Sequence, residues 1–209
     1  IQIRRINEIY NKIIAEPSVI MELSEYFTFD VPGAKFSPAY RNKIWDGKIR
    51  LLNSLTCQLY AGLNLYIEEF AKKRDYTIEY LSDFSNEEFS LEQAEKFIKE
   101  LKPTMQPRDY QMEAFIHAVT QKRALLLSPT ASGKSFIIYL LVRYYAERTL
   151  IIVPTTSLVS QLASDFADYG FNSDALVHRV YSGQDKSSNK PITISTWQSL
   201  FKMPKEYFQ

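Results

Sequence analysis

Short apolar runs alternate with helical patterns through the second half of the chain, and this rhythm constrains the fold more than any other feature of the sequence. The apolar runs cover residues 123–127, 150–153, 177–181 and 192–195. Helical patterns follow the first two runs, at 135–148 and 157–169. Such alternation predicts parallel strands, because strands that run in the same direction are usually connected by a crossover helix. We therefore expect an α/β fold with a sheet covered by helices.

The first half of the chain predicts a smaller α+β domain. Helical spacing is present at 18–27, 63–71 and 91–101, and short strands are expected at 48–53, 58–60 and 76–81. Pro103 and Pro107 follow the last of these helices, after an acidic stretch between residues 83 and 100. Because proline ends helices, we expect the domain boundary here, with an accessory domain over 1–103 and a parallel-sheet domain over 104–209.

Composition excludes several classes of protein. The 209 residues carry a formal net charge of +1, so bulk positive charge does not drive binding to nucleic acid. Cys57 is the only cysteine, which excludes an internal disulfide, and the two histidines belong to no Cys/His cluster that would hold zinc. No apolar run approaches the roughly 18 residues that a membrane-spanning helix requires.

A phosphate-binding loop is predicted between the first apolar run and the helix that follows it. Residues 128–135 read Ser-Pro-Thr-Ala-Ser-Gly-Lys-Ser. A loop that opens a helix directs backbone N–H groups and the positive end of the helix dipole at a phosphate. Gly133 permits a close approach of the backbone, Lys134 can reach the β- and γ-phosphates, and the Ser135 hydroxyl can ligate Mg²⁺. Ser128 stands where the general P-loop pattern has its first glycine.

Three further segments resemble motifs of superfamily 2 helicases and translocases, which often lack that first glycine. Residues 107–111, Pro-Arg-Asp-Tyr-Gln, resemble the R-x-Y-Q element that precedes the P-loop in this superfamily. Residues 153–161 resemble motif Ia, and residues 194–200 resemble motif Ic. Four motifs in the right order are far more specific than any one of them. The resemblance implies that 104–209 is an incomplete RecA-like domain, the N-terminal part of the first helicase domain.

The resemblance implies ATP and Mg²⁺ as cofactors. It assigns nucleotide binding to residues around the loop, namely Arg108, Tyr110, Gln111, Thr130, Ala131, Ser132, Gly133, Lys134 and Ser135. Lys134 and Ser135 are the implied catalytic residues, Ser135 holds the Mg²⁺, and the Gln111 amide reads the adenine edge. Residues of motifs Ia and Ic are implied to contact nucleic acid, namely Pro154, Thr155, Thr156, Gln161, Thr196, Trp197 and Gln198.

The first half of the chain carries a second resemblance. Residues 41–52 resemble the W-D-G-x-I-R-L-L stretch in the N-terminal domain of UvsW-type phage helicases. Residues 35–50 contain five cationic side chains and one carboxylate. Cations beside aromatic rings suit a nucleic-acid surface. We therefore expect nucleic-acid contacts from Arg41, Lys43, Trp45, Lys48 and Arg50. The alternative is a solvated basic face with Trp45 half-buried in the core.

Together the two resemblances imply a phage ATP-dependent DNA helicase or translocase that acts on branched recombination or fork DNA. DNA is the expected partner, and single-strand-binding or recombination proteins are further possible partners. We expect a monomer in the cytoplasm of the infected host cell, without membrane contact. Motif II, the carboxylate pair that holds Mg²⁺ in this superfamily, has no match, since Asp165 and Asp168 lie on the motif Ia helix. We therefore expect an N-terminal fragment, inactive alone, that lacks motif II and the second RecA-like domain.

Other interpretations of these residues stay open. Gly-Lys-Ser also occurs on ordinary surface loops, Tyr110 and Gln111 suit an exposed surface, and Thr155 is an ordinary helix cap. Trp197 can belong to the core. A non-catalytic DNA-binding module with a degenerate P-loop is therefore an alternative function. A P-loop kinase is a weaker one, because it leaves the R-x-Y-Q and motif Ia matches unexplained.

Overall fold

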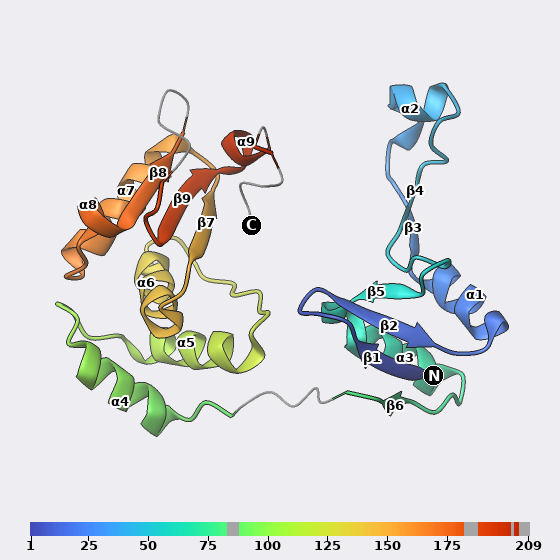
Figure 1. Ribbon diagram of the computed structural model, residues 1–209, viewed down its shortest axis with the longest axis horizontal. Helices are drawn as coiled ribbons and strands as arrows, with labels where there is room; N and C mark the ends of the chain where they lie inside the picture. Colours follow the sequence, from blue (N-terminus) through green and yellow to red (C-terminus); the bar gives the residue numbers. More distant parts are fainter. Residues whose placement is uncertain (83–87, 182–187, 202, 205–209) are drawn as a thin grey trace. The chain divides into compact units, whose positions relative to one another are not determined.

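The computed structural model describes residues 1–82, 88–181, 188–201 and 203–204, and the chain divides into two compact units. The first unit covers Ile1–Ser85 and the second covers Asn86–Gln209 (Figure 1). Each unit has a buried hydrophobic core of its own. None of the helices in the described ranges has the length and hydrophobicity that crossing a membrane requires.

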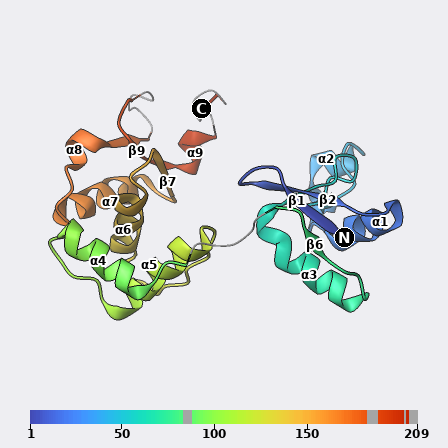
Figure 2. The ribbon, with the colours of Figure 1, turned by 60° about the horizontal axis from the view of Figure 1, so that its bottom comes forward.

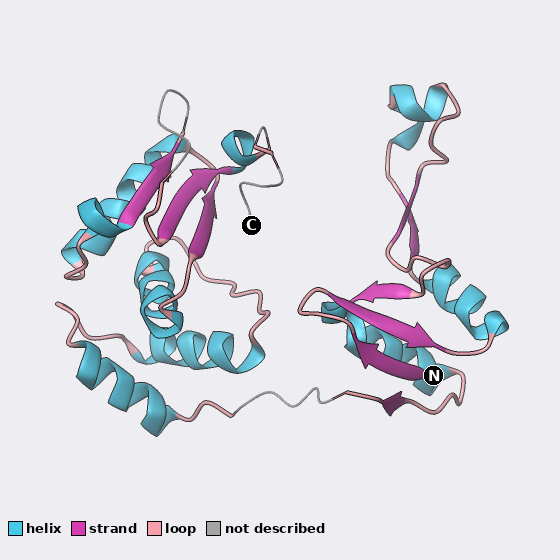
Figure 3. Ribbon diagram, viewed as in Figure 1, coloured by secondary structure: helices cyan, strands magenta, loops and turns pink. Residues whose placement is uncertain are grey.

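A four-stranded sheet and two helices form the base of the first unit (Figure 3). The strand order is β5 (Gln58–Tyr60), β2 (Tyr10–Ile14), β1 (Gln2–Arg5) and β6 (Glu79–Tyr80). β1 runs antiparallel to β2 and parallel to β6, and β2 runs antiparallel to β5.

The helices of the first unit are α1 (Pro17–Tyr26) and α3 (Asn64–Lys73), the latter preceded by the 3-10 turn η2 (Ala61–Leu63). Proline at the first position of α1 suits a helix start, where its missing N–H costs nothing. The helices and strands share one core, which includes Ile3, Ile13, Leu23, Ile67 and Phe70.

An arm of residues 28–50 projects from this base (Figure 1). Its strands β3 (Thr28–Asp30) and β4 (Lys48–Arg50) pair antiparallel. Between them the chain forms the 3-10 turn η1 (Ala34–Phe36) and the short helix α2 (Pro38–Arg41). We call residues 33–47 the arm tip. No residue of η1 or α2 is buried, so the arm tip stands outside the core of the unit.

A three-stranded parallel sheet organises the second unit. Its order is β7 (Thr149–Val153), β9 (Ile192–Thr196) and β8 (Val177–Val180). Helix α7 (Thr156–Asp168) packs on the sheet, and α6 (Lys134–Tyr145), α5 (Asp109–Gln121) and α4 (Leu91–Leu101) follow in succession, each against the one before (Figure 2). The short helices α8 (Ser173–Leu176) and α9 (Trp197–Leu200) precede β8 and follow β9.

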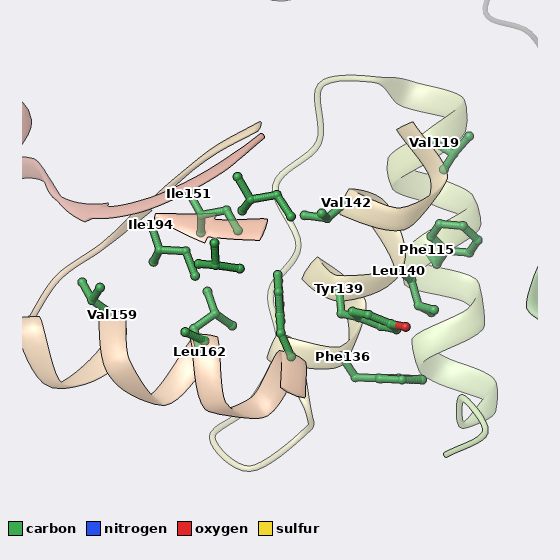
Figure 4. Packing of buried hydrophobic residues seen from close by; sticks show 14 of the residues in the cluster. Phe115, Val119, Phe136, Tyr139, Leu140, Val142, Ile151, Val159, Leu162 and Ile194 are labelled. Carbon is green, nitrogen blue, oxygen red and sulfur yellow. The ribbon is translucent and has the colours of Figure 1, made fainter. Parts of the chain in front are cut away.

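Helix α6 is apolar on nearly all sides because it lies between other helices. It buries Phe136, Ile137, Tyr139, Leu140 and Val142. A helix that is hydrophobic all round must be covered on all sides, and α5 and α7 supply that cover here. Figure 4 shows Val159 and Leu162 of α7 close to Ile151 and Ile194 of the sheet, with Leu140 of α6 beside Phe115 of α5.

The parallel sheet and the α/β fold predicted from the sequence are confirmed. The five expected helices correspond to α1, α3, α4, α6 and α7. The sequence patterns did not predict β1, β2 or α5. The turn between β1 and β2 depends on Asn7, whose Oδ1 accepts hydrogen bonds from the backbone of Ile9 at 2.9 Å and Tyr10 at 2.8 Å.

The strand predicted at 123–127 is wrong. Residues 124–129 have no regular secondary structure, and the side chains of Leu125 and Leu127 are 84% and 89% exposed. A strand needs a neighbour for its N–H and C=O groups. In the described part of the chain β7 pairs with β9 alone, and no strand pairs with this segment.

The boundary between the units lies before α4, whereas the sequence placed it after that helix, at 103/104. The apolar face of α4 packs on α5, with the rings of Phe97 and Phe115 stacked at 5.6 Å. Beyond α4, the Thr104 hydroxyl donates to the Asp168 carbonyl oxygen at 2.6 Å and ties the connection to the end of α7. The two prolines therefore mark a turn between helices of one unit.

We predict that Phe115→Ala destabilises the second unit by about 3–5 kcal/mol, because a fully buried ring is lost from a closely packed aromatic cluster. Phe70→Ala, an equally buried phenylalanine of the other core, is the matched control. Amide hydrogen exchange resolved by peptide measures both. Faster exchange in α1 and α3 of the Phe115→Ala variant would contradict two separate cores.

Candidate functional site

Two residues of the predicted phosphate loop have a left-handed backbone conformation before α6 begins. Ala131 has φ 64° and Gly133 has φ 76°. Lys134, the first residue of α6, folds back over the loop, and its Nζ donates to the carbonyl oxygens of Ser128 at 3.3 Å and Pro129 at 2.7 Å. The first N–H groups of α6 have no partner within the helix. The loop therefore offers an ammonium group and the positive end of a helix dipole to an anion.

The buried amide of Gln111 ties helix α5 to this loop. Its Oε1 accepts from the backbone N–H of Arg108 at 2.9 Å, and its Nε2 donates to the carbonyl oxygens of Ser132 at 3.0 Å and Gly133 at 3.4 Å. A Cβ at position 133 would lie 2.4 Å from that Nε2, and φ there is positive. Glycine is therefore required at 133.

Tyr110 and Arg108 extend this connection. The Tyr110 hydroxyl donates to the Ser132 carbonyl oxygen at 2.9 Å, and Arg108 Nη1 donates to that hydroxyl at 3.1 Å. The interpretation of Gln111 as a surface residue is wrong, since its side chain is 6% exposed. Both ends of its amide are bonded to backbone, so adenine recognition by Gln111 stays a prediction.

A cavity of about 550 Å³ lies beside the loop. Apolar side chains and loop backbone form its walls, among them Ala114, Leu126, Ile137, Pro129, Thr130 and Ala131. Arg108 and Tyr110 stand at the same cavity. Its volume falls in the range of small-molecule sites. Apolar walls with a few polar groups suit a flat heterocycle such as a nucleobase.

Ser135, the predicted Mg²⁺ ligand, shares a hydrogen bond with the hydroxyl of Tyr169 at 2.8 Å. Burial raises the pKa of Tyr169, so the phenol is neutral at physiological pH. A serine hydroxyl is an oxygen ligand of the kind Mg²⁺ takes together with nucleotide phosphates. Within the described ranges no group of three His, Cys, Asp or Glu side chains could hold a metal, and Mg²⁺ binding by Ser135 stays a prediction.

The parallel sheet brings the two predicted nucleic-acid motifs to one edge. Val153 pairs with Thr196, so the residues that follow them, Pro154 and Trp197, lie at the carboxyl ends of adjacent strands. The exposed members of this set are Pro154, Thr155, Thr156, Gln161, Trp197 and Gln198. The Thr155 hydroxyl accepts from the Leu158 backbone N–H at 3.4 Å as a helix cap.

Thr196 is buried, and Trp197 is not part of the core. The Thr196 side chain is 5% exposed and shares a hydrogen bond with the Ser199 hydroxyl at 3.1 Å, whereas Trp197 is 57% exposed. The core interpretation of Trp197 is therefore wrong. Nucleic-acid contact by this edge stays a prediction, with Trp197 as its most accessible aromatic side chain.

In the arm the predicted residues divide into two roles. Trp45 is half-buried, and its Nε1 donates to the Lys48 carbonyl oxygen at 2.8 Å. Arg50 donates from Nη1 to Asp46 Oδ1 at 3.2 Å, and this hydrogen bonding lowers the pKa of Asp46 to about 2. Trp45 and Arg50 therefore hold the tip in shape, whereas Lys43 is exposed, next to a hollow of about 860 Å³.

Lys48 and Arg41 each contact a neighbouring residue of the arm but remain exposed to solvent. Lys48 Nζ lies 3.8 Å from Asp30, and Arg41 donates to the Phe36 carbonyl oxygen at 2.9 Å. Both side chains are exposed, so their charges face solvent. Their nucleic-acid contacts, like those of Lys43, stay predictions.

Sequence patterns missed Tyr169 and the exposed apolar residues of the arm tip, Phe36 and Ile44. Tyr169 meets Ser135 across 34 positions of sequence, and no local pattern encodes that contact. Phe36 and Ile44 carry a weak signal, since both stand beside a lysine in a segment rich in cations.

Comparison with known proteins assigns the family. A family model described as "DNA helicase UvsW, N-terminal" matches residues 1–81, and one described as "Type III restriction enzyme, res subunit" matches residues 104–208. The crystal structure of the UvsW helicase from bacteriophage T4 matches with a TM-score of 0.88 at 32% identity, over 99% of this chain and 78% of that chain. The chain belongs to the UvsW helicase family.

Curated relatives agree with the UvsW assignment. The ATP-dependent DNA helicase uvsW of Enterobacteria phage T4 is 34% identical over 210 residues, which cover 94% of this chain and 42% of the relative. The DNA 3'-5' translocase XPB2 of Sulfurisphaera tokodaii is 29% identical over 106 residues, which cover 51% of this chain and 23% of the relative. The chain thus spans less than half the length of either relative. The predicted resemblance to UvsW-type helicases is confirmed.

We predict that Gly133→Ala lowers the free energy of unfolding by about 1–3 kcal/mol, because a methyl group would collide with the Gln111 amide and the backbone φ is positive. In the double variant Gly133→Ala/Gln111→Ala the collision is absent. The double variant is therefore expected to lose less stability than the two single variants together, by about 0.5–3 kcal/mol. Urea unfolding measures the three variants, and strict additivity would contradict the contact.

Proposed function

We propose that this protein acts as an ATP-dependent DNA helicase or translocase on branched recombination or fork DNA. The observation that carries the proposal is the register of Val153 with Thr196, which puts Pro154 and Trp197 on one sheet edge in the same unit as the phosphate loop. A phosphate loop alone fits any nucleotide-binding enzyme. An edge of the same unit that exposes hydroxyl, amide and indole groups favours an enzyme that also holds nucleic acid.

ATP would bind through the loop and the first turn of α6. Lys134 would exchange the carbonyl oxygens of Ser128 and Pro129 for the β- and γ-phosphates, which is favourable because the phosphates carry full negative charge. The base would enter the cavity beside Tyr110, and Ser135 would hold Mg²⁺. When bound, Mg²⁺ neutralises phosphate charge during transfer of the γ-phosphoryl group.

DNA would contact the sheet edge of the second unit and the arm tip of the first unit. Backbone N–H groups at the start of α7 and the Thr156 hydroxyl suit a phosphate, and Trp197 suits stacking on a base. The protein would work as a monomer in the cytoplasm of the infected cell, beside single-strand-binding or recombination proteins.

A non-catalytic DNA-binding module is the second candidate. One observation favours it: the Lys134 ammonium is bonded to carbonyl oxygens of its own loop. This candidate keeps DNA binding by the arm tip and predicts no nucleotide hydrolysis at all.

We predict that Lys134→Ala in the intact gene product lowers ATP hydrolysis at least about 100-fold, because the loop loses the charge that stabilises the transferring phosphoryl group. DNA binding without nucleotide should stay within a few-fold of the wild type. Lys96→Ala, an exposed lysine on α4, is the matched control. Retained hydrolysis or unwinding in Lys134→Ala would overturn the mechanism, and a wild type without hydrolysis would favour the second candidate.

A further inference from the structure

Two large apolar side chains stand in solvent on the arm tip. Phe36, before α2 in the sequence, is 70% exposed, and Ile44, after α2, is 79% exposed. They contribute nothing to the core of the unit, whose buried residues lie in the base. Large apolar side chains on a projecting element favour a contact surface, because exposure there costs solubility without a gain in stability.

The arm tip is held rigid by contacts that leave these side chains outside. Gly47, with φ +80°, passes so close to Ala34 and Tyr40 that a Cβ would lie 3.0 Å from each. The Val31 backbone N–H donates to the Gly47 carbonyl oxygen at 2.8 Å. The Trp45 and Arg50 hydrogen bonds brace the returning strand. Phe36 and Ile44 are therefore presented on a fixed support.

Cations flank both apolar side chains. The Lys35 ammonium lies 5.3 Å from the centroid of the Phe36 ring, and Arg41 is hydrogen-bonded to the Phe36 carbonyl oxygen. Lys43 precedes Ile44 and has a left-handed backbone, with φ 56°. Asp46 is neutralised by Arg50, which leaves the tip with net positive charge. Such a surface matches DNA with unpaired bases. The apolar side chains can contact the flat faces of the bases, and the cations can contact the phosphates between them.

We propose that the arm tip is a wedge for unpaired bases at a DNA branch, with Phe36 and Ile44 against the bases and Lys35, Arg41 and Lys43 on the flanking phosphates. Phenylalanine and isoleucine side chains enter between base steps and unstack them in other DNA-binding proteins. The hollow beside Tyr40 and Ile44, of about 860 Å³, has room for a displaced nucleotide. The inference rests on the proposed action on branched DNA and names the structure in that DNA which the tip recognises.

The test compares the intact gene product with its Phe36→Ala/Ile44→Ala variant, without ATP, on a three-way junction that carries 2-aminopurine at the branch point. The wild type is expected to raise the 2-aminopurine fluorescence, because the base is unstacked. The variant should lose that rise and bind the junction about 5- to 100-fold more weakly, the loss expected when base contacts are removed. Met21→Ala/Leu65→Ala removes equally exposed apolar side chains from α1 and α3 and serves as the matched control.

A second variant, Lys35→Gln/Lys43→Gln, tests the phosphate contacts independently. The slope of log affinity against log salt should fall by about one for each cation removed. An unchanged slope would overturn the assignment of these lysines.

Three results would overturn the wedge. They are junction affinity and fluorescence unchanged in Phe36→Ala/Ile44→Ala, an equal loss on unbranched duplex, and an equal loss in the control variant. Sedimentation that shows self-association of the wild type, abolished in the same variant, would assign the tip to a contact between copies instead. Since no step uses ATP, failure of Lys134→Ala to stop hydrolysis would refute the proposed mechanism without changing these readings.

Discussion

The amide of Gln111 is the interaction on which the second unit's candidate site depends. A primary amide donates and accepts at once, and here its acceptor caps the start of α5 while its donor holds two carbonyl oxygens of the phosphate loop. Because the side chain is buried, losing either end would leave a polar group unsatisfied. Gly133 follows from this contact, since any larger residue would collide with it.

The parallel sheet sets the second constraint. Its register fixes which residues emerge together at the carboxyl edge, so two segments more than 40 positions apart become neighbours there. Helix α7 begins at that edge and ends beside Ser135, where Tyr169 meets the loop. The candidate nucleotide and nucleic-acid sites thus share one helix. In the first unit the arm is a separate element, and polar contacts rather than a hydrophobic core hold its conformation.

Local patterns predicted what local forces decide. Helix α4 matches its expected range because apolar spacing agrees with a cap at Ser90, which accepts from the Gln93 backbone N–H. The loop at 128–135 was predicted from eight residues in the same way, and phosphate binding there stays a prediction. The contact-based division puts α4 with the second unit because the stacking of Phe97 on Phe115 joins segments that no single pattern spans. The hydrogen bonds of Trp45 and Arg50 were missed because the type of a residue does not show its partner.

The unpaired segment before the phosphate loop has a consequence for the behaviour of the chain in solution. Leu125 and Leu127 are almost fully exposed, and Leu150 and Ile152 are exposed on β7, which pairs with β9 alone among the described strands. Proteins usually protect such edges, because an apolar strand edge is a template for pairing with another molecule. This chain on its own would therefore associate edge to edge as its concentration rises, and its colloidal stability would be lower than its fold stability suggests.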